Sequence, residues 1–493
     1  MIASHPIFPL TRRAAIAGIG ALCLSTVLGC DRVSANANAV LLPDYREPGD
    51  LDDTEAFRRA LDVSPRIHFP AGRGSGPDGA YLMAAVDSDN LPSGLDLSGD
   101  GPERSVIRRS YRREGPFILH CDSKSADPGQ NIRDLRFRDL SFEDEVESRG
   151  FSEFDYLVML NGVSDVVFDN VHFIGFRGDG VHLGSSTVSQ IERHNRQVVI
   201  RNCLFDGITY NNRNAVSVID CEGLLIEDCG FRDCSRFGGA QPSDPFDPYT
   251  GIQAPGAIDL EPNQDAFAII RDVVIRNNIF SGGGGYGVCL NLLADSAVDI
   301  AQSGIVIERN RIADRWGGFG IHGGSSSAAD GTRSAAISFD RNTVEGCEKP
   351  FIVDGIRGLT IRDNIFSDCA TMAELGYVNG NRDVLVSGNT FRLLGRRESG
   401  YGLWVRDIRN LDLRDNEFVD IGLEDRRFGI ALAFVSGGMS GVSLRDNTFA
   451  SPSGKTTEAI TVFAAARPDR SSFAVAGNTL SFAAPAIGRA LGL

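Results

Sequence analysis

The sequence predicts a single-stranded right-handed parallel β-helix, a solenoid in which each turn of the chain adds one coil of strands. An eight-residue phrase with apolar first, third and eighth positions recurs between Leu135 and Leu480, as in Leu135 to Phe142 and Val442 to Phe449. Successive copies lie 22 to 32 residues apart, except for one longer interval between Cys229 and Asn278. A period of that size with strand-like alternation is typical of solenoids, because a lone coil cannot bury its apolar face.

The sixth position of the phrase, here called the ladder position, predicts how the coils are joined. Stacked amides can donate to and accept from the copies above and below, so an asparagine ladder satisfies its own buried groups. Phenylalanines at the eighth position should stack inside in the same way. A leucine-rich repeat has a similar period, but its leucine consensus and helical segments are missing from this sequence. The ladder asparagines are Asn278, Asn310, Asn342, Asn364, Asn389, Asn416, Asn447 and Asn478, after Leu140, Val171, Cys203 and Cys229 in the earlier copies.

The first residues predict an export signal rather than a part of the folded domain. Arg12 and Arg13 precede an apolar stretch, 14–29, that is short for a membrane span and resembles a twin-arginine export signal. The run that ends at Cys30 resembles a bacterial lipobox, which implies lipidation of Cys30, with ordinary cleavage nearby as the alternative. We therefore expect an export signal over 1–29, a tether over 30–43 and the β-helix domain over 44–493. The expected location is the bacterial cell envelope, as a periplasmic or outer-surface lipoprotein.

The start of the expected domain predicts a cap on the solenoid. An acidic run ending at Thr54 is followed by a helical pattern over 55–61, then by a strand over 66–70. The Gly-Asp…Asp-Asp-Thr start, the Phe69-Pro70 strand end and the turn over 97–101 resemble the pectate-lyase-like and family 28 glycoside-hydrolase-like β-helix proteins. That resemblance implies the superfamily but not the reaction, because this fold hosts lyases, hydrolases, epimerases and non-enzymatic phage parts.

Composition narrows the function classes. The formal net charge is −16, which is unfavourable for binding nucleic acid. Nearly all positive charge is arginine, since the only lysines are Lys124, Lys349 and Lys455. The cysteines lack metal-ligand spacing, and burial as small hydrophobic residues is favoured over disulfide formation, which export would permit. No metal site is predicted.

A second strand in most coils begins with a small residue and predicts a surface that could carry chemistry. Alternation places its aliphatic residues inside and the residues between them outside. The outward column expected from stacked coils contains His182, Ser217, Asp259, Cys289 and His322. The next outward column contains Gly184, Glu261 and Asn291. With coils about 4.8 Å apart, His182 and His322 should each lie on the order of 10 Å from Asp259.

The densest cluster of candidate residues surrounds Asp259 and Glu261, and the long interval from Cys234 to Gly256 is expected to form a loop that overhangs it. Two carboxylates on one face of a strand repel, and one should keep its proton, which suits a general acid beside a general base. We expect Asp259, Glu261 and His182 to be catalytic. A structural alternative is that Glu261 ends its strand and pairs with Arg213 or Arg271. The residues expected to bind substrate are Asp179, Arg213, Asn214, Asn291 and His322.

These residues favour a glycoside hydrolase that acts on an extracytoplasmic polysaccharide or oligosaccharide without a cofactor. A uronate lyase or C5-epimerase is the first alternative, with Arg213 or a histidine as base and calcium as an optional partner. A non-catalytic carbohydrate-binding β-helix is the second. Expected partners are the carbohydrate and, through the lipid anchor, a membrane. Trp404 and its neighbour Tyr401 could stack on a sugar, but their distance from Asp259 favours ordinary surface aromatics.

Overall fold

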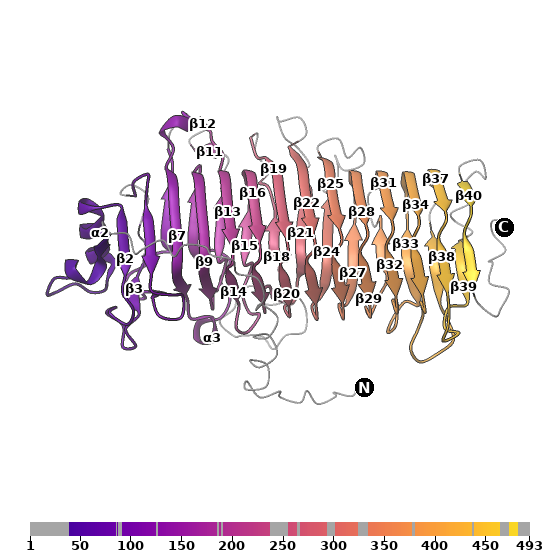
Figure 1. Ribbon diagram of the computed structural model, residues 1–493, viewed down its shortest axis with the longest axis horizontal. Helices are drawn as coiled ribbons and strands as arrows, with labels where there is room; N and C mark the ends of the chain where they lie inside the picture. The colour runs from indigo at the N-terminus through magenta and orange to yellow at the C-terminus, as the bar shows by residue number, and fades with distance from the viewer. Residues whose placement is uncertain are drawn as a thin grey trace, which may run out of the picture. The chain divides into compact units, whose positions relative to one another are not determined.

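The computed structural model describes residues 39–84, 86, 91–124, 127–184, 187–188, 191–236, 255–263, 267–292, 301–323, 334–376, 380–435, 438–463 and 473–481. Val40–Leu493 make one compact unit, separate from Met1–Ala39. Within it the described strands stack coil upon coil in chain order as a right-handed parallel β-helix, so the predicted fold class is confirmed (Figure 1).

One face of the solenoid is a sheet of twelve parallel strands, here called the groove sheet. Its strands are β6 (Phe117–Asp122), β8 (Tyr156–Asn161), β10 (Val181–Gly184), β15 (Val216–Val218), β18 (Gly256–Leu260), β21 (Tyr286–Leu292), β24 (Gly317–Gly323), β27 (Lys349–Val353), β30 (Ala373–Leu375), β33 (Tyr401–Val405), β36 (Ile430–Phe434) and β39 (Glu458–Val462).

The other strands lie before or after the turn that carries the ladder position. The strands before it are β1 (Val40–Leu41), β2 (Arg66–Phe69), β4 (Asp96–Gly99), β7 (Arg133–Glu143), β9 (Ser164–Ile174), β13 (Arg196–Arg201), β16 (Cys221–Glu227), β19 (Ile270–Arg276), β22 (Gln302–Glu308), β25 (Ser334–Asp340), β28 (Arg357–Arg362), β31 (Asn381–Ser387), β34 (Ile408–Arg414), β37 (Ser440–Arg445) and β40 (Phe473–Ala476). The strands after it are β3 (Tyr81–Met83), β5 (Val106–Arg109), β14 (Leu204–Asp206), β17 (Gly230–Arg232), β20 (Ile279–Ser281), β23 (Arg311–Ala313), β26 (Thr343–Glu345), β29 (Ile365–Ser367), β32 (Thr390–Arg392), β35 (Glu417–Val419), β38 (Thr448–Ala450) and β41 (Thr479–Ser481). β7 and β9 run through the turn and pair on both sides of it.

The turn between these two sets of strands explains the recurring phrase. The residue before each ladder position is Asp, Asn, Arg or Gly with a φ between 53° and 67°, the left-handed region that short polar residues and glycine adopt most easily. Each ladder asparagine from Asn278 to Asn447 donates its Nδ2 to the next Oδ1 at 2.9–3.1 Å. The same Oδ1 accepts the backbone N–H of the preceding asparagine. The predicted single line of stacked asparagines is therefore confirmed.

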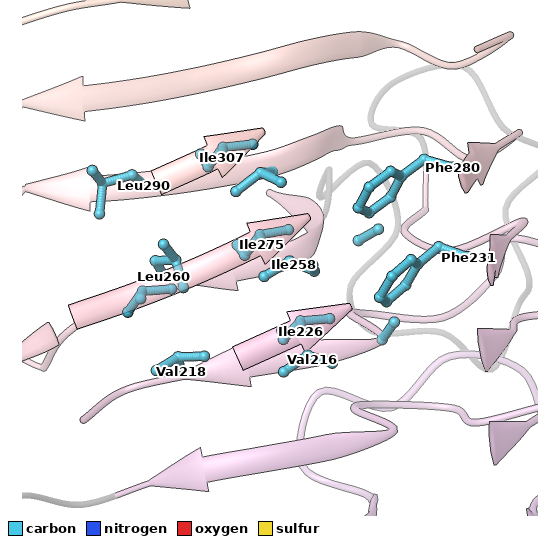
Figure 2. Packing of buried hydrophobic residues seen from close by; sticks show 14 of the residues in the cluster. Val216, Val218, Ile226, Phe231, Ile258, Leu260, Ile275, Phe280, Leu290 and Ile307 are labelled. Carbon is cyan, nitrogen blue, oxygen red and sulfur yellow. The ribbon is translucent and has the colours of Figure 1, made fainter. Parts of the chain in front are cut away.

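The interior is filled by apolar residues from all three sets of strands. Figure 2 shows Val216 and Ile258 of the groove sheet facing Ile226 and Ile275, with Phe231 and Phe280 stacked at the side. The eighth-position phenylalanines stack as predicted, with ring centroids 4.5–5.2 Å apart in the two runs Phe173–Phe280 and Phe366–Phe449. Ile312 and Val344 fill the column between the two runs.

The small residues that begin the groove-sheet strands make room for this column. A Cβ on Gly180 would lie 3.1 Å from the Phe205 ring, and a Cβ on Gly287 would lie 2.9 Å from Ile312. In most of these strands two successive residues therefore face inward, first a small one and then an aliphatic one. The next residue is turned outward at the same place in every coil, which positions the candidate site.

The N-terminal end is closed by a helix, as the sequence predicted. The α-helix α2 (Thr54–Val63) buries Ala56, Phe57 and Ala60 against the first coil. The predicted tether ends earlier than expected, because β1 pairs with β2 and Leu42, in the 3₁₀ helix η1 (Leu42–Tyr45), is fully buried. The remaining elements are short: the 3₁₀ helix η3 (Pro128–Gln130), the helix α3 (Val146–Arg149) and the hairpin β11 (Thr187–Val188) and β12 (Ile191–Glu192).

The described cysteines are buried free thiols, in agreement with the preference for a packing role over disulfides. Among the described residues, no helix is both long enough and apolar enough to cross a bilayer.

Candidate functional site on the groove sheet

The outer face of the groove sheet brings the candidate catalytic residues into adjacent coils. His182 pairs in register with Ser217, Ser217 with Asp259, and Asp259 with Cys289. This is the outward column that alternation predicted for these four residues. Glu261 follows two residues after Asp259, so it belongs to the neighbouring column of the same face.

The predicted position of His322 in this column is wrong. Cys289 pairs with Gly320, and His322 pairs with Asn291, so His322 belongs to the column of Glu261. The cause lies in β24, where Phe319 and Ile321 both point inward and a glycine precedes each of them. Both Gly318 and Gly320 match the small residue expected at the start of the strand. The prediction took Gly320, which shifts the expected register by two residues. His322 contacts the Tyr286 ring, with centroids 5.4 Å apart, and burial lowers the pKa of His322.

The first unit of the site is a buried Asp179–His182 dyad. Asp179 Oδ2 lies 2.8 Å from His182 Nδ1, and the Asp179 side chain is fully buried. Burial opposes ionisation of this carboxyl, but the charge of Arg213 and the hydrogen bond with His182 prevail and lower the pKa of Asp179. An ionised carboxylate on Nδ1 fixes the ring and leaves Nε2 to accept a proton, which is the arrangement of a general base.

Two further residues shape the space around the imidazole. The Tyr156 ring lies against His182 with centroids 4.5 Å apart, and burial raises the pKa of Tyr156 to about 12. Gly184 also lies beside the ring. A Cβ there would come within 2.8 Å of His182 Cδ2 and Nε2, so only glycine leaves the ring in its present place.

The second unit is the carboxyl pair formed by Asp259 and Glu261. Asp259 is 0% exposed, whereas the Glu261 side chain is 40% exposed. Burial, followed by repulsion from Glu261 and a hydrogen bond with it, raises the pKa of Asp259 well above its ordinary value. The pair therefore shares one proton, as two adjacent carboxyls in a poorly solvated site must. Asn214 Nδ2 donates to Asp259 Oδ2 at 3.2 Å, and Asn291 Nδ2 donates to Oδ1 at 3.4 Å.

Arg213 joins the two units. Its Nη1 donates to both Asp179 oxygens at 3.2 and 3.1 Å and to Ser217 Oγ at 3.0 Å, while its Nη2 donates to Glu261 Oε2 at 3.0 Å. The guanidinium is largely buried, and the surrounding carboxylates raise the pKa of Arg213 against the effect of burial. One cation is thus matched by two ionised carboxylates, one in each unit.

The structure brings together most of the residues named from the sequence and buries three of them completely, among them Asp259, which was expected to be catalytic. Asp179 and Asn214, both expected to contact substrate, are fully buried and instead hold His182, Arg213 and Asp259. One part of the structural alternative for Glu261 holds, because Glu261 forms an ion pair with Arg213. Its side chain nevertheless remains partly exposed.

Sequence reasoning missed Tyr156 and Gly184. Tyr156 begins a strand that lacks the small first residue used to find the others, although Leu157, Val158 and Leu160 after it are buried. Gly184 was placed correctly in the second column, but its role depends on the ring position of His182, which spacing does not give.

Several predictions lie outside the described residues. They are the export signal, Cys30 and the segment 237–254 that was expected to overhang this face. Among the described residues, no group of three or more His, Cys, Asp or Glu side chains is arranged to hold a metal ion.

The fold, its ladder and its stacked coils agree with a known family. The sequence profile of the right-handed beta helix region family matches residues 156–467. This chain belongs to that family. It is 25% identical over 401 residues to the uncharacterized protein YclG of Bacillus subtilis strain 168, covering 74% of this chain and 64% of the relative. It is 23% identical over 351 residues to the SPbeta prophage-derived uncharacterized protein YorA of the same organism, covering 66% and 57%. The matches thus span less than two thirds of either relative.

Solved structures agree on the fold. The mannuronan C-5 epimerase AlgE6 A-module of Azotobacter vinelandii superposes with a TM-score of 0.57 at 16% identity, over 90% of this chain and 100% of that one. The N-terminal fragment of gene product 12 of bacteriophage phi29 gives a TM-score of 0.54 at 14% identity, over 92% and 72%. One of these proteins is an enzyme by its name and the other a phage gene product, so the likeness shows the β-helix and leaves the reaction to the site itself.

Proposed function

We propose that this protein hydrolyses glycosidic bonds in a polysaccharide that lies along the groove sheet. The observation that carries the proposal is the bridge through Arg213, which holds a histidine–carboxylate dyad and a proton-sharing carboxyl pair on one face, in nearby coils. Glycoside hydrolysis needs a general acid at the leaving oxygen and a base for the attacking water, and the two units supply one of each.

The steps follow from exposure and charge. Glu261, the exposed member of the pair, passes the proton held by Asp259 to the glycosidic oxygen as the bond to the anomeric carbon breaks. His182 Nε2 takes a proton from the water that attacks that carbon, and Asp179 stabilises the resulting imidazolium. Asp259 and Glu261 are then both ionised beside Arg213 and the two asparagine amides, and the pair regains its proton from solvent as His182 loses one. The role of Asp259 is to hold the proton that Glu261 transfers, because burial keeps Asp259 itself from the substrate.

The charge balance of the site favours a neutral sugar. The carboxylates of Asp179 and Glu261 already neutralise the single positive charge of Arg213, so little positive charge remains to pair with a substrate carboxylate. The acidic chain as a whole, with a net charge of −16, would also repel a polyanion. We further propose that the enzyme acts outside the cytoplasm, held to a membrane through a lipid on Cys30, as the first thirty residues suggest.

A second candidate function is proton abstraction from a uronate, as in a lyase or C5-epimerase. The contact between Tyr156 and His182 favours it, since a phenol and an imidazole on one side of a sugar could remove and return a proton. This chemistry would also need a cation to neutralise the substrate carboxylate, a role for Arg213 or for calcium.

Turnover of purified protein on laminarin, a neutral glucan, and on polygalacturonate and alginate separates the candidates. The hydrolase proposal expects new reducing ends from the neutral polymer without the ultraviolet absorbance of an unsaturated uronate. Absorbing products would support the lyase instead, and tritium exchange into alginate without cleavage would support the epimerase. Binding without any turnover would support a non-catalytic protein.

A further inference from the structure

A cluster of four aromatic side chains lies on the outer face of the groove sheet, far along the solenoid from the carboxyl pair. Tyr401 and Trp404 lie on β33, with ring centroids 4.8 Å apart and planes at 74°. Phe463 packs 5.9 Å from Trp404 and 6.3 Å from Tyr401, and Phe428 lies 6.0 Å from Tyr401. All four rings are partly exposed.

The interior of this coil does not need Trp404. Leu403 and Val405, its neighbours on β33, fill the core and are both 0% exposed, so Trp404 projects outward between them. Its partner in the next coil is Ala433, which presents too little side chain to cover an indole. A tryptophan that is supported at its edges and left partly exposed offers an apolar surface with a polar N–H at its rim.

The strand register places Trp404 in line with the proposed active site. Asp259 pairs with Cys289, Cys289 with Gly320, and Gly320 with Ile352. Ile352 pairs with Glu374, and Glu374 with Trp404. Five coil steps of about 4.8 Å separate the two positions by about 24 Å. The residues between them are small or apolar except Glu374, whose charge is paired with Lys349.

We propose that Trp404 and Tyr401 form a distal sugar-binding platform for the same polysaccharide that the carboxyl pair cleaves. The proposal rests on the proposed function, and it adds that the substrate is a long chain lying parallel to the solenoid axis. An indole ring binds the C–H face of a pyranose by dispersion and exclusion of water, and its N–H can donate a hydrogen bond to a sugar hydroxyl. A polymer long enough to reach both positions binds through both, whereas a fragment of two or three sugars at the carboxyl pair never touches Trp404.

The test compares polymer and fragments as substrates of Trp404→Ala, Trp404→Phe and a control, Ile365→Ala. Ile365 is an exposed apolar residue on β29, away from the groove sheet, so its loss removes a similar surface without affecting the platform. For the polymer that wild type cleaves, we expect Trp404→Ala to raise KM roughly three- to tenfold, the scale of one aromatic contact, with kcat nearly unchanged. Trp404→Phe should recover part of this loss, and fragments of two or three sugars should be cleaved equally well by all variants. An equal loss on polymer and fragments, or no loss on either, would overturn the platform.

A binding measurement separates failure of the platform from failure of the proposed function. The chain has two tryptophans, so in Trp316→Phe all tryptophan fluorescence comes from Trp404. If no polymer is cleaved but laminarin or alginate changes that fluorescence saturably, the hydrolase proposal fails and the platform stands. If the signal responds to none of the three polysaccharides, the platform is refuted whether or not there is turnover. A wild-type dimer that Trp404→Ala converts to a monomer would instead assign the cluster to a contact between two copies.

Discussion

Removing one amide from the middle of the asparagine ladder should destabilise the whole solenoid. Asn364 is 1% exposed, and its Oδ1 accepts the backbone N–H and the Nδ2 of Asn342 at 2.8 and 3.1 Å. Its Nδ2 donates to the Phe339 carbonyl at 2.7 Å and to Asn389 Oδ1 at 2.9 Å. Asn364→Ala breaks all four bonds and leaves the buried N–H of Asn342 without its acceptor. An unsatisfied buried group costs about 1–3 kcal/mol, so we expect a total loss of about 3 kcal/mol.

Asn478→Ala is the matched control for this loss. Asn478 belongs to the last described coil and is partly exposed, so water can replace its bonds, and a loss of about 1 kcal/mol or less is expected. Asn364→Cys should fall between the two, because cysteine occupies the ladder position at Cys203 and Cys229, where the Cys229 sulfur accepts the Cys203 N–H at 3.4 Å. Urea unfolding followed by circular dichroism measures the three variants, with equal slopes required before the midpoints are compared. Equal midpoints for Asn364→Ala and Asn478→Ala would refute a buried, mutually bonded ladder.

Three other predictions concern the site and the leader. Gly184→Ala should push the His182 ring out of place and lower kcat at least tenfold with little change in melting temperature; full activity would contradict the crowding at this position. Asp259 has a raised pKa in the fold, so its contribution to stability is complete at low pH and is lost as the pH rises through that pKa. Wild type should therefore lose stability as the pH rises from acidic to alkaline, by about 1.4 kcal/mol for each tenfold difference in proton affinity between folded and unfolded Asp259, and Asp259→Asn should abolish this loss. If the melting temperature of Asp259→Asn depends on pH as that of wild type does, the result would argue against a shared proton. Cys30→Ala should release the protein from membranes in cell fractionation, and retention would rule out the lipid anchor.

The repeats could be predicted from the sequence because each coil reports the same physical constraints. The left-handed turn accepts few residue types, the ladder position needs a self-pairing side chain, and the phenylalanine column needs small residues opposite it. Asn364 and Phe391 were placed from these constraints alone, and the structure places them in the same stacks.

The chemistry of the site could be predicted only in part. Alternation says which side of a sheet a residue faces but not what covers it, so the complete burial of Asp259 and Asp179 could not be foreseen. His322 was misplaced because β24 contains two glycines that each precede an inward residue, and spacing alone cannot choose between them. The contact of Tyr156 with His182 joins side chains from neighbouring coils, and no pattern within one coil reports it.

The most direct test of the central claim is the turnover of Glu261→Gln, measured per folded molecule on a polysaccharide that wild type cleaves. The change removes a shared proton while keeping an oxygen that can accept from Arg213. We therefore expect kcat to fall about a hundredfold or more with little change in melting temperature. Glu222→Gln is the control. Glu222 forms an ion pair with Arg196, both residues lie outside the groove sheet, and the variant should therefore keep full activity. Wild-type turnover by folded Glu261→Gln, or an equal loss in Glu222→Gln, would contradict an active site centred on this carboxyl pair.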